Sequence, residues 1–222
     1  MSGALLSIKA KAIALWLISL PPAWKDPEPA AEREARLQGY GVALAHEAER
    51  LTCTGEFAPT PEKPCKPEWR GTWQQLVVAV GGHGWFESKL ARNIQEGKCR
   101  PLQCDPRWAR DKKGHFVRDA EGQKVRFYRA RSVFQLQATT PAAREVWDRM
   151  LGLGQEAVSA SVYAATRFFV VHQCKNDMLK ILSSGSGQGC VASPRGRERH
   201  EFFQKELPKF QAVYFRLQKS GE

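Results

Sequence analysis

The chain has 222 residues, of which 42% are hydrophobic, and it carries a formal net charge of +11 at pH 7. This hydrophobic content is enough for a packed core, and it excludes disorder over most of the chain. The longest apolar run, Ala12 to Leu20, is too short to cross a bilayer, so no membrane span is expected. The excess of cations favours polyanionic partners such as nucleic acid, an anionic membrane surface or an anionic cell-wall polymer.

The N-terminal region is predicted to contain two helices. Residues 4–20 have helical character and end at two consecutive prolines. They fit a buried or amphipathic helix better than a signal peptide, because no small-x-small cleavage site follows. A second helix is predicted to run to about Leu51, with Asp26 as its N-cap, Pro27 at its first position and Glu28 in its first turn.

This second helix has few apolar positions, namely Leu37, Val42 and Leu44, and is therefore expected to lie on a surface. We assign residues 1–51 to an N-terminal helical extension and residues 52–222 to the main domain. The proline-rich residues 52–71 are predicted to form a loop. Thr72 then caps a helix that leads into Glu87 and buries one face, formed by Trp73, Leu76, Val77 and Val80.

The rest of the chain is predicted to be mainly helical. Residues 111–128 alternate between glycine turns, which indicates a short hairpin. Thr140 caps a helix, and residues 156–174 form a central buried helix that turns one apolar face inward through Val158, Val162, Ala165 and Phe169. Residues 183–190 form a tight glycine loop, and the C-terminal helix is expected to break at Pro208. The fold class is therefore α+β with helices dominant.

The six cysteines fall into three local couples: Cys53 with Cys65, Cys99 with Cys104, and Cys174 with Cys190. Six cysteines allow 15 pairings, so the sequence does not fix one, but the local couples favour three short-range disulfides. Disulfides imply an oxidising destination, such as a periplasm or the outside of the cell. A zinc site is the rival interpretation, which irregular spacing and the lack of a CxxC pair make less favoured. No metal and no cofactor is predicted.

One carboxylate stands out, because Glu87 follows two aromatic residues, Trp85 and Phe86, in the segment "GHGWFESKLARN". A carboxyl group against aromatic rings is poorly solvated when charged, which favours its protonated form. A protonated carboxyl can donate its proton to a leaving oxygen, as a general acid does in glycoside cleavage. The simpler alternative is a glutamate at a helix end with its carboxylate in water, and the local residues alone favour that alternative.

Four segments in a fixed order change this weighting: "WFESKLARNIQEGKC", "ARSVFQLQATT", "SASVYAA" and "LSSGSGQGC". Over residues 70–218 they resemble the lysozyme-like lytic transglycosylases of the soluble lytic transglycosylase group. Glu87-Ser88 matches the catalytic Glu-Ser pair of that family, and Ser132 to Gln135 matches its "GLMQ" segment with Ser in place of Gly. Residues 183–189 stand where the family has a late "AYN-G" turn, but without Tyr-Asn. The cysteines are similar to those of phage-encoded and bacterial wall-degrading proteins.

The resemblance implies a lysozyme-like domain that cleaves the β-1,4 bond between N-acetylmuramic acid and N-acetylglucosamine in peptidoglycan. Glu87 would protonate the glycosidic oxygen and then accept the proton of the 6-hydroxyl, which gives an anhydro sugar. A second carboxylate would instead indicate a hydrolytic muramidase, and Glu96 is the nearest candidate. The residues expected to bind substrate are Ser88, Glu96, Ser132, Gln135, Tyr163 and Ser184.

The implied partner is peptidoglycan, and the implied location is a periplasm or cell envelope, the outside of the cell, or a virion. The N-terminal helices would dock the enzyme on other virion or envelope proteins. The competing class is a non-enzymatic structural or nucleic-acid-binding protein on a degenerate lysozyme-like fold. Cations and aromatics alternate near the C-terminus, as in nucleic-acid-binding surfaces, but Phe202, Phe203 and Phe210 better suit a packed helix, which makes nucleic acid the less favoured partner.

Overall fold

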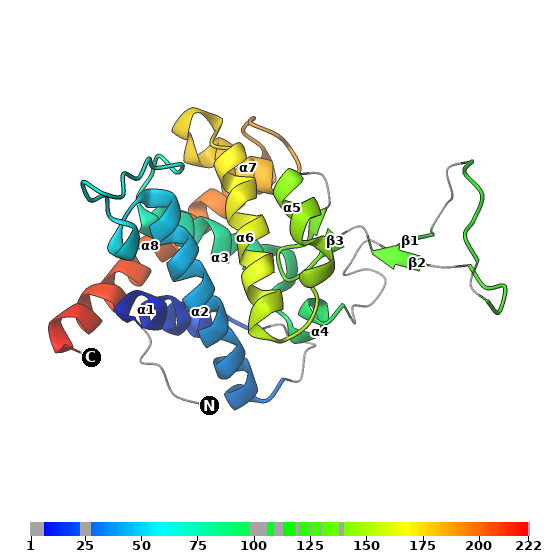
Figure 1. The fold of residues 1–222 in the computed structure, drawn as a ribbon, viewed down its shortest axis with the longest axis horizontal. Coiled ribbons are helices and arrows are strands. Elements are labelled where there is room, and N and C mark those ends of the chain that lie inside the picture. Colours follow the sequence, from blue (N-terminus) through cyan, green and yellow to red (C-terminus); the bar gives the residue numbers. More distant parts are fainter. Residues whose placement is uncertain are drawn as a thin grey trace.

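The computed structural model describes residues 7–22, 28–97, 106–108, 113–118, 120–124, 126–128, 130–137 and 140–221. The helices are α1 (Ile8–Ser19), α2 (Ala30–Thr52), α3 (Trp73–Ser88), α4 (Arg92–Gln95), α5 (Pro141–Val146), α6 (Gln155–Val171), α7 (Met178–Gly185) and α8 (Pro194–Ser220) (Figure 1). Short 3-10 turns lie at Gly55–Phe57, Trp147–Arg149 and Cys174–Asn176. The predicted mainly helical α+β class is confirmed.

Two small antiparallel sheets complete the described structure. In the first, β1 (Pro106–Trp108) pairs with β2 (Arg126–Tyr128), and this ribbon lies to one side of the helices (Figure 1). An isolated bridge joins Arg118 to Lys124 around a turn that contains Gly122, whose φ is 78°. The predicted hairpin is therefore present, although its first strand begins before residue 111. In the second sheet β3 (Ala130–Arg131) pairs with β4 (Leu136–Gln137).

The start of α3 is set by a local hydrogen-bond pattern, as the sequence predicts. The hydroxyl of Thr72 accepts from the backbone N–H of Gln75 at 3.2 Å, and the side chain of Gln75 accepts from the N–H of Thr72 at 2.8 Å. Such a capping box satisfies two of the free N–H groups at a helix start. The helix ends at Lys89 and Leu90, both with a φ of 55°, so Glu87 lies in its last turn.

Helix α2 is part of the core, so its predicted surface position is wrong. Its buried residues are Arg36, Leu37, Tyr40, Gly41, Ala43, Leu44, Ala45, Glu47, Ala48 and Leu51. Many of these are small, and small residues let helices approach closely: a Cβ on Gly41 would lie 2.5 Å from the carbonyl oxygen of Ala10 in α1. A count of large apolar residues does not detect a face of this kind, and Val42, which that count included, is 39% exposed.

The start of α2 also differs from the prediction. The helix begins at Ala30, and Glu28 lies before it rather than in its first turn. A proline disfavours helical geometry in the residue before it, so Pro29 keeps Glu28 outside the helix. Glu28 instead accepts two hydrogen bonds from Arg36, at 2.8 and 2.6 Å. Asp26 and Pro27 lie outside the described residues.

One hydrophobic cluster spans the described helices. It includes residues of α1 and α2 together with residues of α3, α6, α7 and α8. Helix α2 runs beside α6 (Figure 1), and the rings of Trp16 in α1 and Phe210 in α8 have centroids 5.6 Å apart. The described part of residues 1–51 therefore packs in the same core as the rest of the chain.

The C-terminal half follows the predicted pattern with two corrections. Thr140 caps α5, and the predicted inward face of α6 is buried. The first residues of the predicted glycine loop belong to α7, which extends to Gly185. Helix α8 continues through Pro208 instead of breaking there. The proline removes one backbone donor, and the buried Phe203 and Phe210 on either side anchor the helix to the core.

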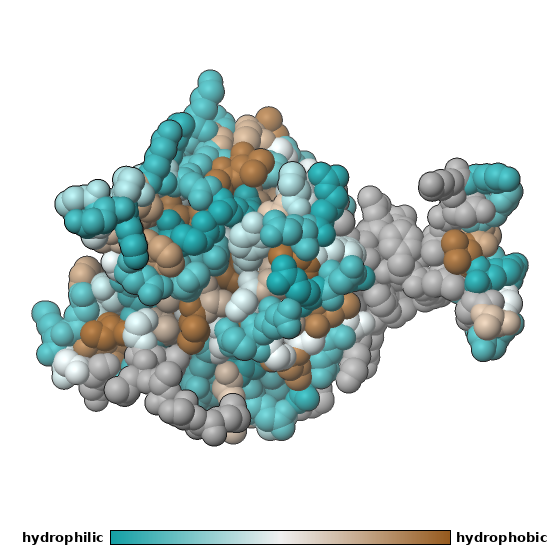
Figure 2. Space-filling model, viewed as in Figure 1, coloured by the Kyte–Doolittle hydropathy of each residue, from teal (hydrophilic) through white to brown (hydrophobic). Residues whose placement is uncertain are grey.

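The described residues contain two of the three predicted disulfides. Cys53 is bonded to Cys65, and Cys174 is bonded to Cys190. Cys99 and Cys104 lie outside the described residues. Within the described chain, no helix combines the length and apolar character needed to span a membrane. On the face drawn in Figure 2, hydrophilic residues predominate and hydrophobic residues form small, separate patches.

Candidate active site

A cavity of about 310 Å³ lies beside the end of α3. Its wall is formed by His83 and Glu87 of α3, by the segment from Gln135 to Gln137, by Thr140, by Phe168 of α6, by residues 184–187 and by Arg195 of α8. Three residues expected from the sequence therefore share one cavity, namely Glu87, Gln135 and Ser184. They come from three segments that are far apart along the chain.

Glu87 is paired with a buried arginine that the sequence analysis did not identify. Arg199 of α8 donates from Nη2 to Oε1 of Glu87 in a close ion pair. The side chain of Arg199 is only 9% exposed, whereas that of Glu87 is 27% exposed. The aromatic neighbours of Glu87 in the sequence, Trp85 and Phe86, both pack against Phe202 of α8, with ring centroids 4.9 and 5.2 Å apart. A cation thus lies beside the carboxylate where the sequence predicted rings alone.

His83 joins this ion pair to the turn before β4. Its Nδ1 lies 2.8 Å from Nη1 of Arg199, and its Nε2 lies 3.0 Å from the carbonyl oxygen of Phe134. Burial is the main cause that lowers the pKa of His83 from 6.5 to about 4, and nearby Arg199 also lowers it, while Glu87 and the bond to Phe134 raise it. The ring is therefore neutral at pH 7. Because Arg199 donates to Nδ1, the proton must lie on Nε2, which donates to Phe134.

The remaining residues of the predicted motifs mainly shape the backbone. Ser88 donates to the carbonyl of Gly84 at 3.0 Å and accepts from the N–H of Leu90 at 3.1 Å, which helps to end α3. Ser132 is fully buried with a φ of 61°, and its hydroxyl accepts from the N–H of Phe134 at 3.3 Å. Ser88 and Ser132 do not line the cavity. Their contacts instead hold the backbone on each side of it.

Gln135 and Ser184 stand on the cavity wall. Gln135 has a φ of 49°, and its Nε2 donates to the carbonyl of Ser132 at 3.1 Å. Ser184 donates to the carbonyl of Ile181 at 2.7 Å, within α7. The loop after Ser184 contains Gly187, whose φ of 80° favours glycine.

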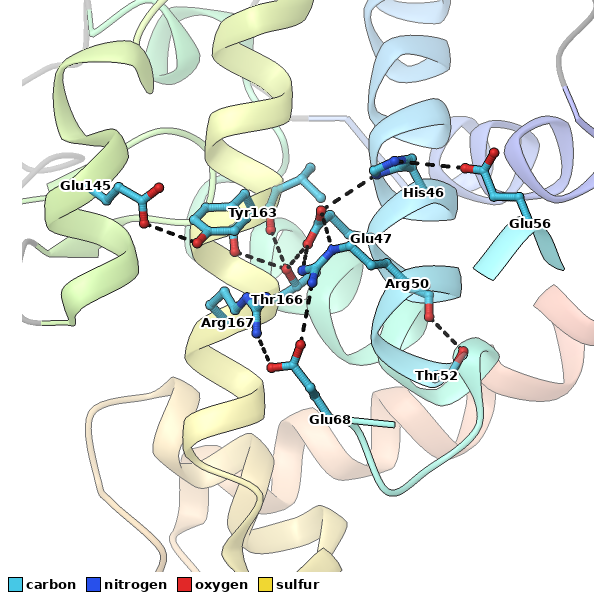
Figure 3. Close-up of polar contacts among 12 residues, drawn as sticks. His46, Glu47, Arg50, Thr52, Glu56, Glu68, Glu145, Tyr163, Thr166 and Arg167 are labelled. Carbon is cyan, nitrogen blue, oxygen red and sulfur yellow. Dashed lines mark hydrogen bonds and ion pairs between the residues drawn. The ribbon is translucent and has the colours of Figure 1, made fainter. Parts of the chain in front are cut away.

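Tyr163 lies in a different part of the molecule. It lines a second cavity, of about 550 Å³, between α2, α5 and α6. Its hydroxyl donates to Glu145 at 3.1 Å, beside a cluster in which Arg50 donates to Glu47 at 2.7 Å (Figure 3). Thr166 of α6 donates to the same carboxylate of Glu47 at 3.5 Å. These contacts tie α2 to α6 and place Tyr163 outside the Glu87 cavity.

Glu87 is the one carboxylate among the described residues of its cavity wall. Glu96 lies at the end of α4, where it pairs with Arg92 at 3.5 Å, and it does not line the cavity. Asp105, Asp111 and Asp119, the next acidic residues along the chain after Glu96, lie outside the described residues. The described part of the chain contains no group of three or more His, Cys, Asp or Glu side chains placed to hold a metal ion.

The sequence analysis assigned neither His83 nor Arg199 to the site, although the sequence holds a local signal for His83. His83 precedes Glu87 by four residues, one helical turn, so the two share a helix face. Arg199 is separated from Glu87 by 112 residues, and no local motif connects the two. Comparison of the chain with protein-family models, with curated proteins and with solved structures gives no match. The transglycosylase resemblance therefore rests on the short motifs, and three of the four segments that carry them contribute a residue to one cavity.

Proposed function

We propose that this protein cleaves the glycan strands of peptidoglycan as a lytic transglycosylase, with Glu87 as its acid and base. One observation carries the proposal. Glu87, Gln135 and Ser184 come from three of the four ordered segments that suggested the family, and the fold brings these three residues to one cavity. A shared cavity is required if these segments act on one substrate.

The proposed reaction needs only one carboxyl group. Glu87 gives its proton to the glycosidic oxygen, and the bond between that oxygen and C1 breaks with its electron pair going to the oxygen. The 6-hydroxyl oxygen of the same muramic acid residue then bonds to C1, and its proton passes to Glu87. The carboxyl group ends the cycle protonated, as it began. Gln135 and the loop after Ser184 are placed to bind sugar hydroxyl or acetamido groups.

The cavity wall favours this mechanism over hydrolysis. An inverting hydrolase places a second carboxylate about 6.5–9.5 Å from the acid, and a retaining one about 5–5.5 Å from it. Among the described residues of the wall, only Glu87 carries a carboxylate. A muramidase is therefore the less favoured form of the same proposal.

The wider properties of the chain fit this substrate. Two disulfides suit an oxidising compartment, such as a periplasm, the cell envelope, the outside of a cell or the surface of a virion. A net charge of +11 favours association with an anionic envelope. Docking on other envelope or virion proteins through the N-terminal helices belongs to the same proposal.

A non-enzymatic role on the same fold is the second candidate. It is favoured by the ion pair between Glu87 and Arg199, because a carboxylate bound to a buried guanidinium also suits a purely structural contact. The two candidates differ in one simple assay. Purified peptidoglycan should lose turbidity with folded, oxidised wild-type protein and with the control Glu96→Gln, but not with Glu87→Gln. If wild type of confirmed fold clears no peptidoglycan, the enzymatic proposal is wrong.

A further inference from the structure

We propose that Arg199 is a positioning residue for Glu87, and that it assigns separate roles to the two carboxyl oxygens. Oε1 is held by Arg199, so the proton that is transferred must be carried by Oε2. The inference rests on the proposed function of Glu87 as acid and base. It adds two residues, Arg199 and His83, that neither the motifs nor the resemblance assigns to the site.

The contacts of Glu87 support this division of roles. Arg199 donates to Oε1, and Oε2 has no hydrogen-bond partner in the described structure. Glu87 lines the cavity, whereas the side chain of Arg199 is 9% exposed and does not line it. A protonated carboxyl keeps one carbonyl-like oxygen, which can accept from Arg199 while the other oxygen donates. The contact therefore holds the acid in place both before and after proton transfer.

Arg199 is itself held from two further sides. Its Nη1 donates to Nδ1 of His83 at 2.8 Å, and its guanidinium lies 5.4 Å from the ring centroid of Phe86. A neutral histidine can accept that bond, and its Nε2 is fixed by the carbonyl of Phe134 at 3.0 Å. Phe134 directly precedes Gln135. The chain of contacts thus links the carboxyl group to the turn that carries a proposed substrate-binding residue.

Gly185, the last residue of α7, lies close to both His83 and Arg199. A Cβ on Gly185 would lie 3.2 Å from Nδ1 of His83 and 3.4 Å from Nη1 of Arg199. The absence of a side chain there gives both groups their space. Three residues of α3 and the close approach of Gly185 in α7 therefore confine one guanidinium, which is more than an exposed ion pair requires.

This arrangement predicts a loss of turnover without a loss of substrate binding. A displacement of about 1 Å in a reacting group can cost on the order of 100-fold in rate. Arg199→Gln should lower kcat on soluble muropeptide oligomers by about that factor and leave KM nearly unchanged, because Arg199 does not line the cavity. Arg199→Lys should restore part of kcat, since an ammonium can still donate to Oε1. The matched control is Arg197→Gln, which removes the same charge from an exposed position on the same helix.

His83 offers a second pair of variants that does not remove the cation. His83→Gln keeps a donor for Phe134 and an acceptor for Arg199, whereas His83→Leu keeps neither. The positioning role predicts that kcat falls further in His83→Leu than in His83→Gln at equal KM. Equal kcat in Arg199→Gln, Arg199→Lys and wild type, with each fold confirmed by circular dichroism, would overturn the inference.

An NMR measurement tests the contact without using activity. A guanidinium anchored through both Nη atoms rotates slowly, so its Nη protons should give resolved signals for Arg199 in wild type. These signals should merge in His83→Leu and in Glu87→Ala. Merged Arg199 signals in wild type would refute the positioning role even if peptidoglycan is cleaved. Resolved signals in a wild type that cleaves no peptidoglycan at any pH would refute the proposed function and leave the anchoring of Arg199 intact.

Discussion

His83 makes the stability of the fold depend on pH in a defined window. The pKa of this buried ring is lowered to about 4, compared with 6.5 in the unfolded chain. The unfolded chain therefore binds a proton between pH 6.5 and 4 that the folded chain does not bind, so the stabilisation is present above pH 6.5 and is lost as the pH falls through this window. Each pH unit in the window is worth about 1.4 kcal/mol. At pH 4.5 the loss is roughly 2 to 3 kcal/mol of unfolding free energy.

Urea unfolding at pH 7 and at pH 4.5 measures this loss. Carboxylates also titrate near pH 4.5, so the loss of unfolding free energy is compared between wild type and His83→Gln. The variant has no histidine at this position and keeps the carboxylates. Wild type should lose roughly 2 to 3 kcal/mol more than His83→Gln over this interval. The control His46→Gln, at a side chain that is 54% exposed, should behave like wild type. An equal loss in wild type and His83→Gln would refute the buried, neutral state of His83.

Two further predictions concern the scaffold. Gly41→Ala should lower the unfolding free energy by about 1 to 2 kcal/mol, because overpacking against the backbone oxygen of Ala10 exceeds the gain in helix propensity. In the matched variant Gly39→Ala, the new methyl group meets only the end of the flexible Gln155 side chain, so the change should be neutral or stabilising by up to about 1 kcal/mol. A greater loss of unfolding free energy in Gly39→Ala than in Gly41→Ala would contradict the α1–α2 packing. Replacing Cys174 and Cys190 by serine should lower the unfolding free energy by about 3 kcal/mol, because the disulfide closes a loop with a sequence separation of 16. An unchanged midpoint of urea unfolding would contradict this prediction.

Features set by neighbouring residues could be predicted from the sequence. Thr72 and Thr140 cap their helices because each hydroxyl reaches an N–H three residues ahead, a contact that needs no tertiary information. The pairings of Cys53 with Cys65 and of Cys174 with Cys190 also close short loops. The sequence also predicted a helix that leads from the Thr72 cap into Glu87, and Glu87 lies in the last turn of α3.

Features set by distant residues could not be predicted. The burial of α2 depends on the small residues of its face meeting α1 and α6, and small residues carry little signal until the partner helix is known. The contact between Arg199 and Glu87 has the same origin, since it exists only because α8 packs on α3. Pro208 is tolerated because the surrounding helix is held by packing that propensity does not include.

In the proposed reaction Glu87 is the sole acid and base, and the 6-hydroxyl oxygen of muramic acid attacks C1 of its own ring. The most direct test is mass spectrometry of the fragments released from purified peptidoglycan by wild type and by Glu87→Gln, both shown to be folded and oxidised. Wild type should release fragments that end in 1,6-anhydromuramic acid, and Glu87→Gln should release none. Fragments with reducing ends, or anhydro fragments released equally by Glu87→Gln, would contradict this mechanism.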